Sequence, residues 1–324
     1  MSSVFKVLII GSGQLGSRHL QGALKSHNKL SIVIVDPSLN ALKLSKIRAN
    51  EIELGHQDSS TKYTQRLPKN QYFNICIIST NANIRAEVTK DFLENCKTDH
   101  IIFEKVLFQK DEDFEFISKL IKEKNISSWV NCPRRTYSHY QEIKKILDIK
   151  KTVEMSVTGS SWGMACNTIH FIDLFSYLVN SSNLKIVKTK FSKHILNSKR
   201  GNNFYEINGL MELQIDTHTL KIYCKNGEKV SLNLKIKNNN NEFSFDELNG
   251  ILQSNIGGTI KIRKQKTSYQ SSETTKIINN LIDKNQCDLT SYQESYKHHL
   301  PLLTVIKKHL SLILKKEFTG CPIT

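Results

Sequence analysis

Three glycines near the start of the chain have the spacing of a phosphate-binding loop. An apolar run at residues 7–10 leads directly into Gly11, Gly13 and Gly16, spaced G-x-G-x-x-G. Gly11 would permit a tight turn after a strand, Gly13 would let a pyrophosphate approach bare backbone, and Gly16 would let the next helix pack close to the sheet. The phosphates would then lie at the positive helix N-terminus. We therefore expect a dinucleotide-binding loop formed by Gly11, Ser12, Gly13, Gln14, Leu15 and Gly16.

An acidic residue follows at the position that a nucleotide ribose requires. A second apolar run, residues 30–35, ends on Asp36, about 20 residues after the glycines. Its carboxylate would accept hydrogen bonds from the two hydroxyls of an adenosine ribose and would repel a 2′-phosphate. This order of elements, in which a strand, the glycines and a helix are followed by a second strand and an acid, predicts an NAD site. NADP is the less favoured cofactor.

The elements needed to position these residues alternate over the first 130 residues or so. Apolar strand candidates alternate with helical patterns, which predicts right-handed crossovers and a doubly wound parallel sheet. The expected strands are 5–10, 30–35, 75–79, 100–103 and 127–131, and the expected helices are 14–27, 38–49, 83–96 and 111–124. Ligands of such a sheet bind beyond the carboxyl ends of its strands. We therefore expect Ser79, Thr80, Asn81, Glu104 and Lys105 to share one rim with the glycine loop and Asp36.

The pattern changes from about residue 151. Alternating segments predict antiparallel strands at 152–158, 184–193, 205–215, 218–224, 229–236 and 258–264, with one helix at 167–179. Further helices are expected at 272–284 and 290–315, the last kinked or broken near His299 by Pro301. We expect a Rossmann domain over 1–131 and an α+β domain with an open, mainly antiparallel sheet over 132–324, the final helix being able to pack back on the first domain.

Composition excludes several classes of protein. The chain has 324 residues, 39% of them hydrophobic, which suits two globular domains. It contains no apolar run of about 18 residues, and its start runs into the first strand without room for a signal peptide. The seven cysteines form no C-x-x-C pair and no zinc spacing, and His298-His299 has no third ligand near it. We expect a cytoplasmic protein with reduced thiols, no membrane segment and no metal.

The net charge of +16 has two interpretations: an anionic partner or substrate, or simply a sequence rich in Lys, Asn and Ile, as AT-rich coding DNA gives, which is the stronger of the two. The lysines are scattered, and no basic stripe interleaved with aromatic residues points to nucleic acid. A phosphorylated or carboxylated substrate is the milder implication.

Five local matches, in order, resemble the Gfo/Idh/MocA family of oxidoreductases. They are the glycine loop followed by Arg18-His19, Asp36, Ile77-Ile-Ser-Thr-Asn81, Phe103-Glu-Lys-Val106 and Asn167-Thr-Ile-His-Phe-Ile-Asp173; Asn131-Cys-Pro-Arg-Arg135 also looks like the family's crossover segment. The resemblance implies a two-domain NAD(P)-dependent enzyme that oxidises a sugar or polyol hydroxyl or reduces the ketone. It also implies a homodimer or homotetramer formed through the open sheet.

Removing hydride from an alcohol carbon requires a base for the hydroxyl proton. By the resemblance, Lys105 and His170 are the catalytic candidates. Taken alone, Lys105 would be read as half of a strand-end ion pair, and His170 as a core histidine of an amphipathic helix. Asp173, three residues after His170, would fix the tautomer of its ring.

Two positions depart from the family pattern. Cys166 stands where many members carry an aspartate four residues before the histidine, and a cysteine supplies no fixed carboxylate. Val106 replaces the proline of Glu-Lys-Pro. Because a cis bond before a non-proline residue costs about 3 kcal/mol, we expect Lys105–Val106 to be trans.

Other residues have weaker assignments to the substrate. Arg134 and Arg135 would clamp a carboxylate or phosphate, or else form structural ion pairs. Trp162 and Tyr137 would stack on a ring or pack in the core. The substrate candidates are Arg134 and Trp162, together with Asn167 and Asp173 from the segment that carries His170.

Two functions remain open. The first is an NAD-dependent oxidoreductase of a sugar, with a nucleotide-linked sugar of surface polysaccharide synthesis as one such substrate. The second is a non-catalytic NAD-binding regulator of the same fold, like the yeast galactose repressor, which the absence of the aspartate at position 166 supports.

Overall fold

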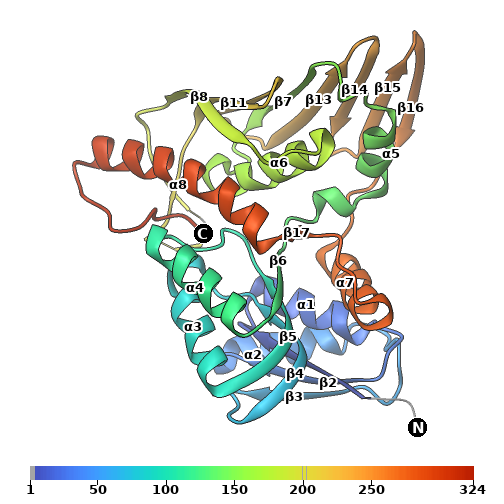
Figure 1. The fold of residues 1–324 in the computed structure, drawn as a ribbon, viewed down its shortest axis with the longest axis vertical. Coiled ribbons are helices and arrows are strands. Elements are labelled where there is room, and N and C mark those ends of the chain that lie inside the picture. Colours follow the sequence, from blue (N-terminus) through green and yellow to red (C-terminus); the bar gives the residue numbers. More distant parts are fainter. Residues whose placement is uncertain (1–3, 199, 202) are drawn as a thin grey trace. The chain divides into compact units, whose positions relative to one another are not determined.

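The computed structural model describes residues 4–198, 200–201 and 203–324, which form two compact units (Figure 1). The N-terminal unit contains the described residues up to Phe108 together with Glu112–Asn131 and Ser268–Tyr292. The C-terminal unit contains the described parts of Gln109–Asp111, Cys132–Thr267 and Gln293–Thr324. The segment Ser268–Tyr292 thus belongs to the N-terminal unit, although its position in the sequence led us to assign it to the second domain.

The N-terminal unit is built on a mostly parallel sheet. Within the described chain its strand order is β17-β6-β5-β4-β1-β2-β3, and only β17 runs antiparallel to its neighbour. The strands are β1 (Phe5–Ile10), β2 (Leu30–Val35), β3 (Ser60–Thr64), β4 (Gln71–Ile78), β5 (Cys96–Phe103), β6 (Ser127–Val130) and β17 (Thr290–Ser291). The crossover helices are α1 (Gln14–Leu24), α2 (Leu39–Ala49), α3 (Ala82–Asn95) and α4 (Asp111–Glu123).

Helix α7 (Gln270–Lys284) packs along α1, although some 250 residues separate the two in sequence. A Cβ added to Gly22 on α1 would lie 2.4 Å from the Ser271 carbonyl oxygen and 2.5 Å from the Thr274 Cβ. Only a glycine allows this approach. The Thr275 hydroxyl lies 2.8 Å from the Gly22 carbonyl oxygen and ties the helices together.

The C-terminal unit is built on an open, mainly antiparallel sheet. Its order in the described residues is β16-β15-β14-β13-β7-β12-β11-β8, with one parallel pair, β7–β12. The strands are β7 (Val153–Ser160), β8 (Leu184–Phe191), β11 (Gly209–Ile215), β12 (His218–Lys225), β13 (Ser231–Asn238), β14 (Asn241–Asp246), β15 (Ile251–Ile256) and β16 (Thr259–Lys264). Also in this unit are the short β9 (Leu196–Asn197) and β10 (Tyr205–Glu206), the 3₁₀ turn Pro133–Thr136, α5 (Ser138–Ile146), α6 (Met164–Val179) and most of α8 (Tyr292–Leu314).

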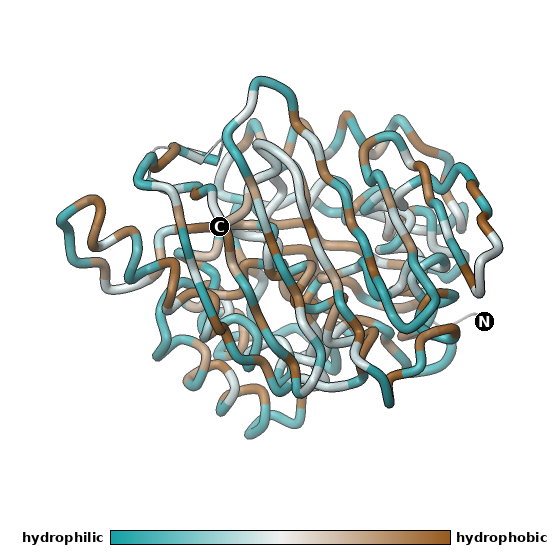
Figure 2. Tube along the Cα trace, turned by 90° about the horizontal axis from the view of Figure 1, so that it is seen from above, coloured by the Kyte–Doolittle hydropathy of each residue, from teal (hydrophilic) through white to brown (hydrophobic). Residues whose placement is uncertain are grey.

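Side chains alternate along this sheet between a buried and an exposed face. β12 is buried and exposed at successive residues, and Figure 2 shows the matching alternation of hydrophobic and hydrophilic residues along the strands. Helix α6 packs on β12, and most of its residues are buried. A Rossmann-type parallel sheet followed by a mainly antiparallel sheet is the predicted fold class, which is confirmed.

Several details of the prediction were wrong: β14, β15 and α5 were not predicted, and two further differences have a clear physical reason. β3 was missed because its residues, Ser-Thr-Lys-Tyr-Thr, lack an apolar run, yet it pairs along its whole length with β2. A kink or a break was expected near His299, and the break does not occur, since α8 continues through Pro301. Leu302, Leu303, Ile306 and Leu310 are at most 1% exposed, so burial of the apolar face outweighs the hydrogen bond that proline removes.

The glycine loop shows two different uses of glycine. A Cβ on Gly16 would lie 1.8 Å from the Gly11 carbonyl oxygen and 2.8 Å from the Ser79 Oγ, so the turn leaves no room for a side chain. A Cβ on Gly13 would meet no atom within 4 Å. Gly16 is therefore a packing residue, whereas the space at Gly13 is open.

Gly16→Ala should lower the free energy of unfolding by about 1–3 kcal/mol, because backbone must move to admit the methyl group. Gly13→Ala, the matched control, should change it by less than about 0.5 kcal/mol. Urea unfolding, followed by Trp129 fluorescence in a Trp162→Phe background, reports on the N-terminal unit. Equal stability of the two variants would contradict this account of the turn.

The core of the C-terminal unit contains histidines that are kept neutral by burial. His139 lies with its ring centroid 4.2 Å from that of Tyr140 and 4.9 Å from that of Phe245. Burial lowers the pKa of His139 to about 4, and it does the same for His298, despite the opposing charge of Glu294. Protonation of either ring therefore favours the unfolded chain.

Stability of the C-terminal unit should fall as the pH drops from about 6.5 toward 4.5, by roughly 1.4 kcal/mol per pH unit for each histidine. The unfolded chain takes up these protons near pH 6.5 and the folded chain only near pH 4. The window lies above the range in which most carboxylates titrate. Urea unfolding monitored by Trp162 in a Trp129→Phe background tests this, and His139→Phe should remove about half of the slope. A flat profile would contradict it.

Candidate active site

The strand register brings the residues that follow four strands to one edge of the N-terminal sheet. Ile10 pairs with Val35 on β2 and with Ile78 on β4, and Ile78 pairs with Phe103 on β5. Because these strands are parallel, their carboxyl ends lie side by side. The residues that come next along the chain begin four adjacent loops at this edge: Gly11, Asp36, Ser79 and Glu104.

The glycine loop and Asp36 are joined directly. The Ser12 amide donates to Asp36 Oδ2 at 2.7 Å, and the Ser38 amide donates to Asp36 Oδ1 at 2.8 Å. Gly11 adopts a φ of +95°, which a side chain would strain, and Gly13 is the N-cap of α1. The carboxylate is thereby fixed beside the N-terminus of the helix.

The remaining loop residues have separate roles. Ser12 is fully buried, and its Oγ lies 2.5 Å from that of Ser45. Gln14 is exposed and accepts a 2.6 Å hydrogen bond from Arg48, whereas Leu15 is half-buried. Arg48 on α2 therefore supports the first turn of α1.

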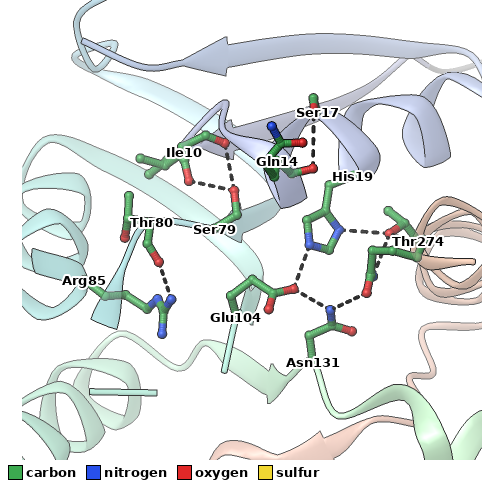
Figure 3. Close-up of polar contacts among 12 residues, drawn as sticks. Ile10, Gln14, Ser17, His19, Ser79, Thr80, Arg85, Glu104, Asn131 and Thr274 are labelled. Carbon is green, nitrogen blue, oxygen red and sulfur yellow. Dashed lines mark hydrogen bonds and ion pairs between the residues drawn. The ribbon is translucent and has the colours of Figure 1, made fainter. Parts of the chain in front are cut away.

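The residues after β4 close the other side of the loop. Ser79 Oγ lies 2.8 Å from the Gly11 carbonyl oxygen and 3.1 Å from that of Ile10 (Figure 3). Asn81 is the N-cap of α3 but makes no capping hydrogen bond through its side chain. The Thr80 carbonyl accepts from the buried Arg85.

This edge fits a dinucleotide. The open space at Gly13 can admit a pyrophosphate against backbone, α1 begins at that point, and Asp36 supplies a fixed carboxylate. The loop therefore has the space, the positive helix end and the ribose acceptor that NAD requires.

Glu104 and Lys105 follow β5 and are only 3% and 4% exposed. Glu104 Oε1 lies 2.9 Å from His19 Nε2 and accepts a 2.5 Å hydrogen bond from Asn131 Nδ2 (Figure 3). Burial alone would raise the pKa of the Glu104 carboxyl. The hydrogen bond and charge of His19, with help from Asn131 and Arg85, outweigh burial and hold this pKa below its usual value.

The peptide bond between Lys105 and Val106 is cis, so the expected trans bond was wrong. The expectation used only the local preference of the bond. Val106, Leu107 and Phe108 are fully buried, and the carbonyl oxygens of Val106 and Leu107 accept from Arg85. Arg85 is distant in sequence from the carbonyl groups that it holds, so the local sequence does not indicate this contact.

The second group of predicted residues lies on α6 in the C-terminal unit. Asn167 Nδ2 donates to the Trp162 carbonyl oxygen at 2.8 Å, and His170 is half-buried. Cys166 is half-buried too, with its thiol toward the Gly163 carbonyl. Lys105 and His170 belong to different units, and their joint action stays a prediction.

Asp173 is 1% exposed and pairs with an arginine. Its two carboxylate oxygens accept hydrogen bonds of 3.0 and 2.8 Å from the guanidinium of Arg135, which also contacts Glu294 at 3.1 Å. The expectation that Asp173 fixes the tautomer of the His170 ring stays a prediction.

Arg134 is likewise paired with a carboxylate, that of Glu247. Its guanidinium makes two hydrogen bonds to Glu247, of 2.8 and 2.6 Å, and lies 4.5 Å from the ring centroid of Phe171. The charge and hydrogen bonds of Arg134 hold the pKa of Glu247 below its usual value against the effect of burial. Trp162 packs edge-on against Phe171 and is 6% exposed.

The contacts of His19, Arg85, Gln270 and Thr274 were missed by reasoning from the sequence. Gln270 and Thr274 lie on α7, and Thr274 Oγ1 is 2.8 Å from His19 Nδ1. The local signals were Glu104, an isolated acid at the end of an apolar strand, and His19, which follows the glycine loop.

Among the described residues, no three histidine, cysteine or acidic side chains are grouped to hold a metal ion. In the same part of the chain, every helix is too short or too polar to cross a bilayer.

Similarity searches relate the chain to known proteins mainly through its fold. The family described as "Oxidoreductase family, NAD-binding Rossmann fold" (GFO_IDH_MocA) matches residues 5–132. No curated protein matches the sequence.

Solved structures resemble the chain over most of its length at low sequence identity. A dehydrogenase (MviM) from Clostridium difficile has a TM-score of 0.69 and 16% identity over 94% of this chain and 99% of that chain. UDP-N-acetylglucosamine 3-dehydrogenase GnnA from Acidithiobacillus ferrooxidans has a TM-score of 0.68 and 12% identity, covering 94% and 97%. The transcriptional regulator Gal80p from Kluyveromyces lactis has a TM-score of 0.67 and 13% identity, covering 93% and 91%.

At these identities the neighbours establish the fold alone, while the match over residues 5–132 identifies the NAD-binding domain. Residues 5–132 therefore match the NAD-binding Rossmann domain of the Gfo/Idh/MocA oxidoreductases.

Proposed function

We propose that this protein is an NAD-dependent oxidoreductase that interconverts a hydroxyl and a ketone on a sugar or sugar derivative. The observation that carries the proposal is the position of Lys105. It is a buried lysine at the carboxyl end of β5, on the same sheet edge as the glycine loop and Asp36.

Bound NAD supplies the hydride acceptor or donor. The residues of the chain must then bind the substrate oxygen and move its proton. Lys105 would hydrogen-bond that oxygen, and as a neutral amine it would take the hydroxyl proton during oxidation. His170 would accept or return that proton, since imidazole titrates near neutral pH.

The substrate class is argued from chemistry and from the fold. The basic chain, with a net charge of +16, suits an anionic substrate such as a nucleotide-linked sugar. One structural neighbour is named as a UDP-N-acetylglucosamine dehydrogenase. We propose a sugar nucleotide used in surface polysaccharide synthesis as the first substrate to test.

Cys166 favours a second candidate function, an NAD-responsive regulator. A thiol stands where many family members carry an aspartate, and a solved regulator, Gal80p, shares the fold. A regulator would bind NADH without turnover. Retention of both Lys105 and His170 favours the enzyme, since a binding protein requires neither.

Lys105→Met should lower kcat by about 10²–10⁴-fold, because it removes the proton acceptor. The dissociation constant for NADH should stay within about twofold. Absorbance of NADH, with NAD⁺ and a panel of sugars and nucleotide sugars, measures turnover. Lys97→Met, an exposed lysine near the other end of β5, is the matched control. Equal activity of the Lys105 variant and the wild type would exclude the catalytic role.

Asp36→Ser should reduce the preference for NADH over NADPH by at least about tenfold, because it removes a ribose acceptor and a charge that repels the 2′-phosphate. Fluorescence titration with both cofactors measures the ratio. Asp58→Ser, at an exposed aspartate of the same unit, controls for the change in net charge. An unchanged ratio would remove Asp36 from the ribose site.

A further inference from the structure

A buried polar cluster of the N-terminal unit ends at the residue before Lys105. His19 bridges it, with Nε2 2.9 Å from Glu104 Oε1 and Nδ1 2.8 Å from Thr274 Oγ1 (Figure 3). His19 and Thr274 are each 1% exposed and Glu104 is 3% exposed. Water therefore cannot readily replace these partners, so each hydrogen bond restricts the geometry.

Asn131 closes the cluster into a ring. Its Nδ2 donates to Glu104 Oε1 and, at 3.0 Å, to Gln270 Oε1. The Thr274 hydroxyl lies 2.9 Å from the Gln270 carbonyl oxygen. Two residues of α7 thus support Glu104 by separate routes, through His19 and through Asn131.

Arg85 holds the chain on the other side of Lys105. This guanidinium, 1% exposed, donates to the carbonyl oxygens of Val106, Leu107 and Thr80. Lys105 is therefore flanked by Glu104, fixed through its side chain, and by Val106, fixed through its backbone.

We propose that α7 acts as a positioning element for Lys105, with Thr274 transmitting its position through His19 and Glu104. This inference rests on the proposed function, in which Lys105 is catalytic. A shift of about 1 Å in a catalytic group is enough to reduce a rate about 100-fold. The first domain alone, residues 1–131, would lack this support, because Gln270 and Thr274 follow the C-terminal sheet in the sequence.

Thr274→Val tests the proposal, because valine keeps the shape of threonine and removes the hydroxyl that hydrogen-bonds with His19 Nδ1. We expect kcat to fall about 10- to 100-fold with the NADH dissociation constant and KM within about twofold. Amide hydrogen exchange of the peptide spanning residues 103–108 should become about tenfold faster, since the cluster no longer restrains it. Thr274→Ser, which keeps the hydroxyl, should restore both.

Thr275→Val is the matched control on the same helix. It removes a hydroxyl that also links α7 to α1, through the Gly22 carbonyl oxygen, but lies outside the cluster. We expect its kcat and its exchange in residues 103–108 to match the wild type. Equal behaviour of the two valine variants in both measurements would overturn the proposal, as would faster exchange in Thr274→Val without a loss of kcat.

The exchange measurement needs no turnover. If Lys105→Met keeps full activity, the catalytic role of Lys105 in the proposed function fails, and with it the catalytic meaning of the cluster. Unchanged exchange in Thr274→Val overturns the positioning role alone and leaves the proposed function intact. The two ideas therefore fail separately.

Discussion

The buried carboxylate of Glu104 connects the parts of the N-terminal unit that are most distant in sequence. It meets α1 through His19, the end of β6 through Asn131, and α7 through both of them. Buried ion pairs are weak contributors to net stability, because desolvation offsets their attraction. Their geometry is nevertheless demanding. Glu104 is better understood as fixing where the end of β5 lies than as strengthening the fold.

The fold class and the edge that carries the candidate site were predictable from the sequence because each rests on a local pattern. Apolar runs define β1, β2, β4 and β5, and parallel strands place their following residues at one edge. The glycine spacing has a direct steric cause at Gly16, where no Cβ fits, and leaves open space at Gly13. Such features depend on residues close in sequence.

Several of the missed features depend on partners that are far away in sequence. β3 has no apolar run and is stabilised by pairing with β2. Helix α8 passes through Pro301 because the apolar residues that follow this proline are buried. The cis bond after Lys105 lies beside Arg85, some 20 residues upstream. Nothing near Thr274 in the sequence indicates that it contacts His19.

The arginines show why residue type alone does not assign a role. Arg134 and Arg135 have the chemistry of a phosphate clamp, but each makes two hydrogen bonds to a buried carboxylate, of Glu247 and of Asp173. Releasing either guanidinium to a substrate would leave that carboxylate buried without its counter-charge, which is costly. The case for Lys105 rests on its position instead. It follows the end of β5, and its two neighbours in sequence, Glu104 and Val106, are held in place by other residues. The chemistry that we propose for the protein therefore depends more on Lys105 and the residues that position it than on the other cations of the chain.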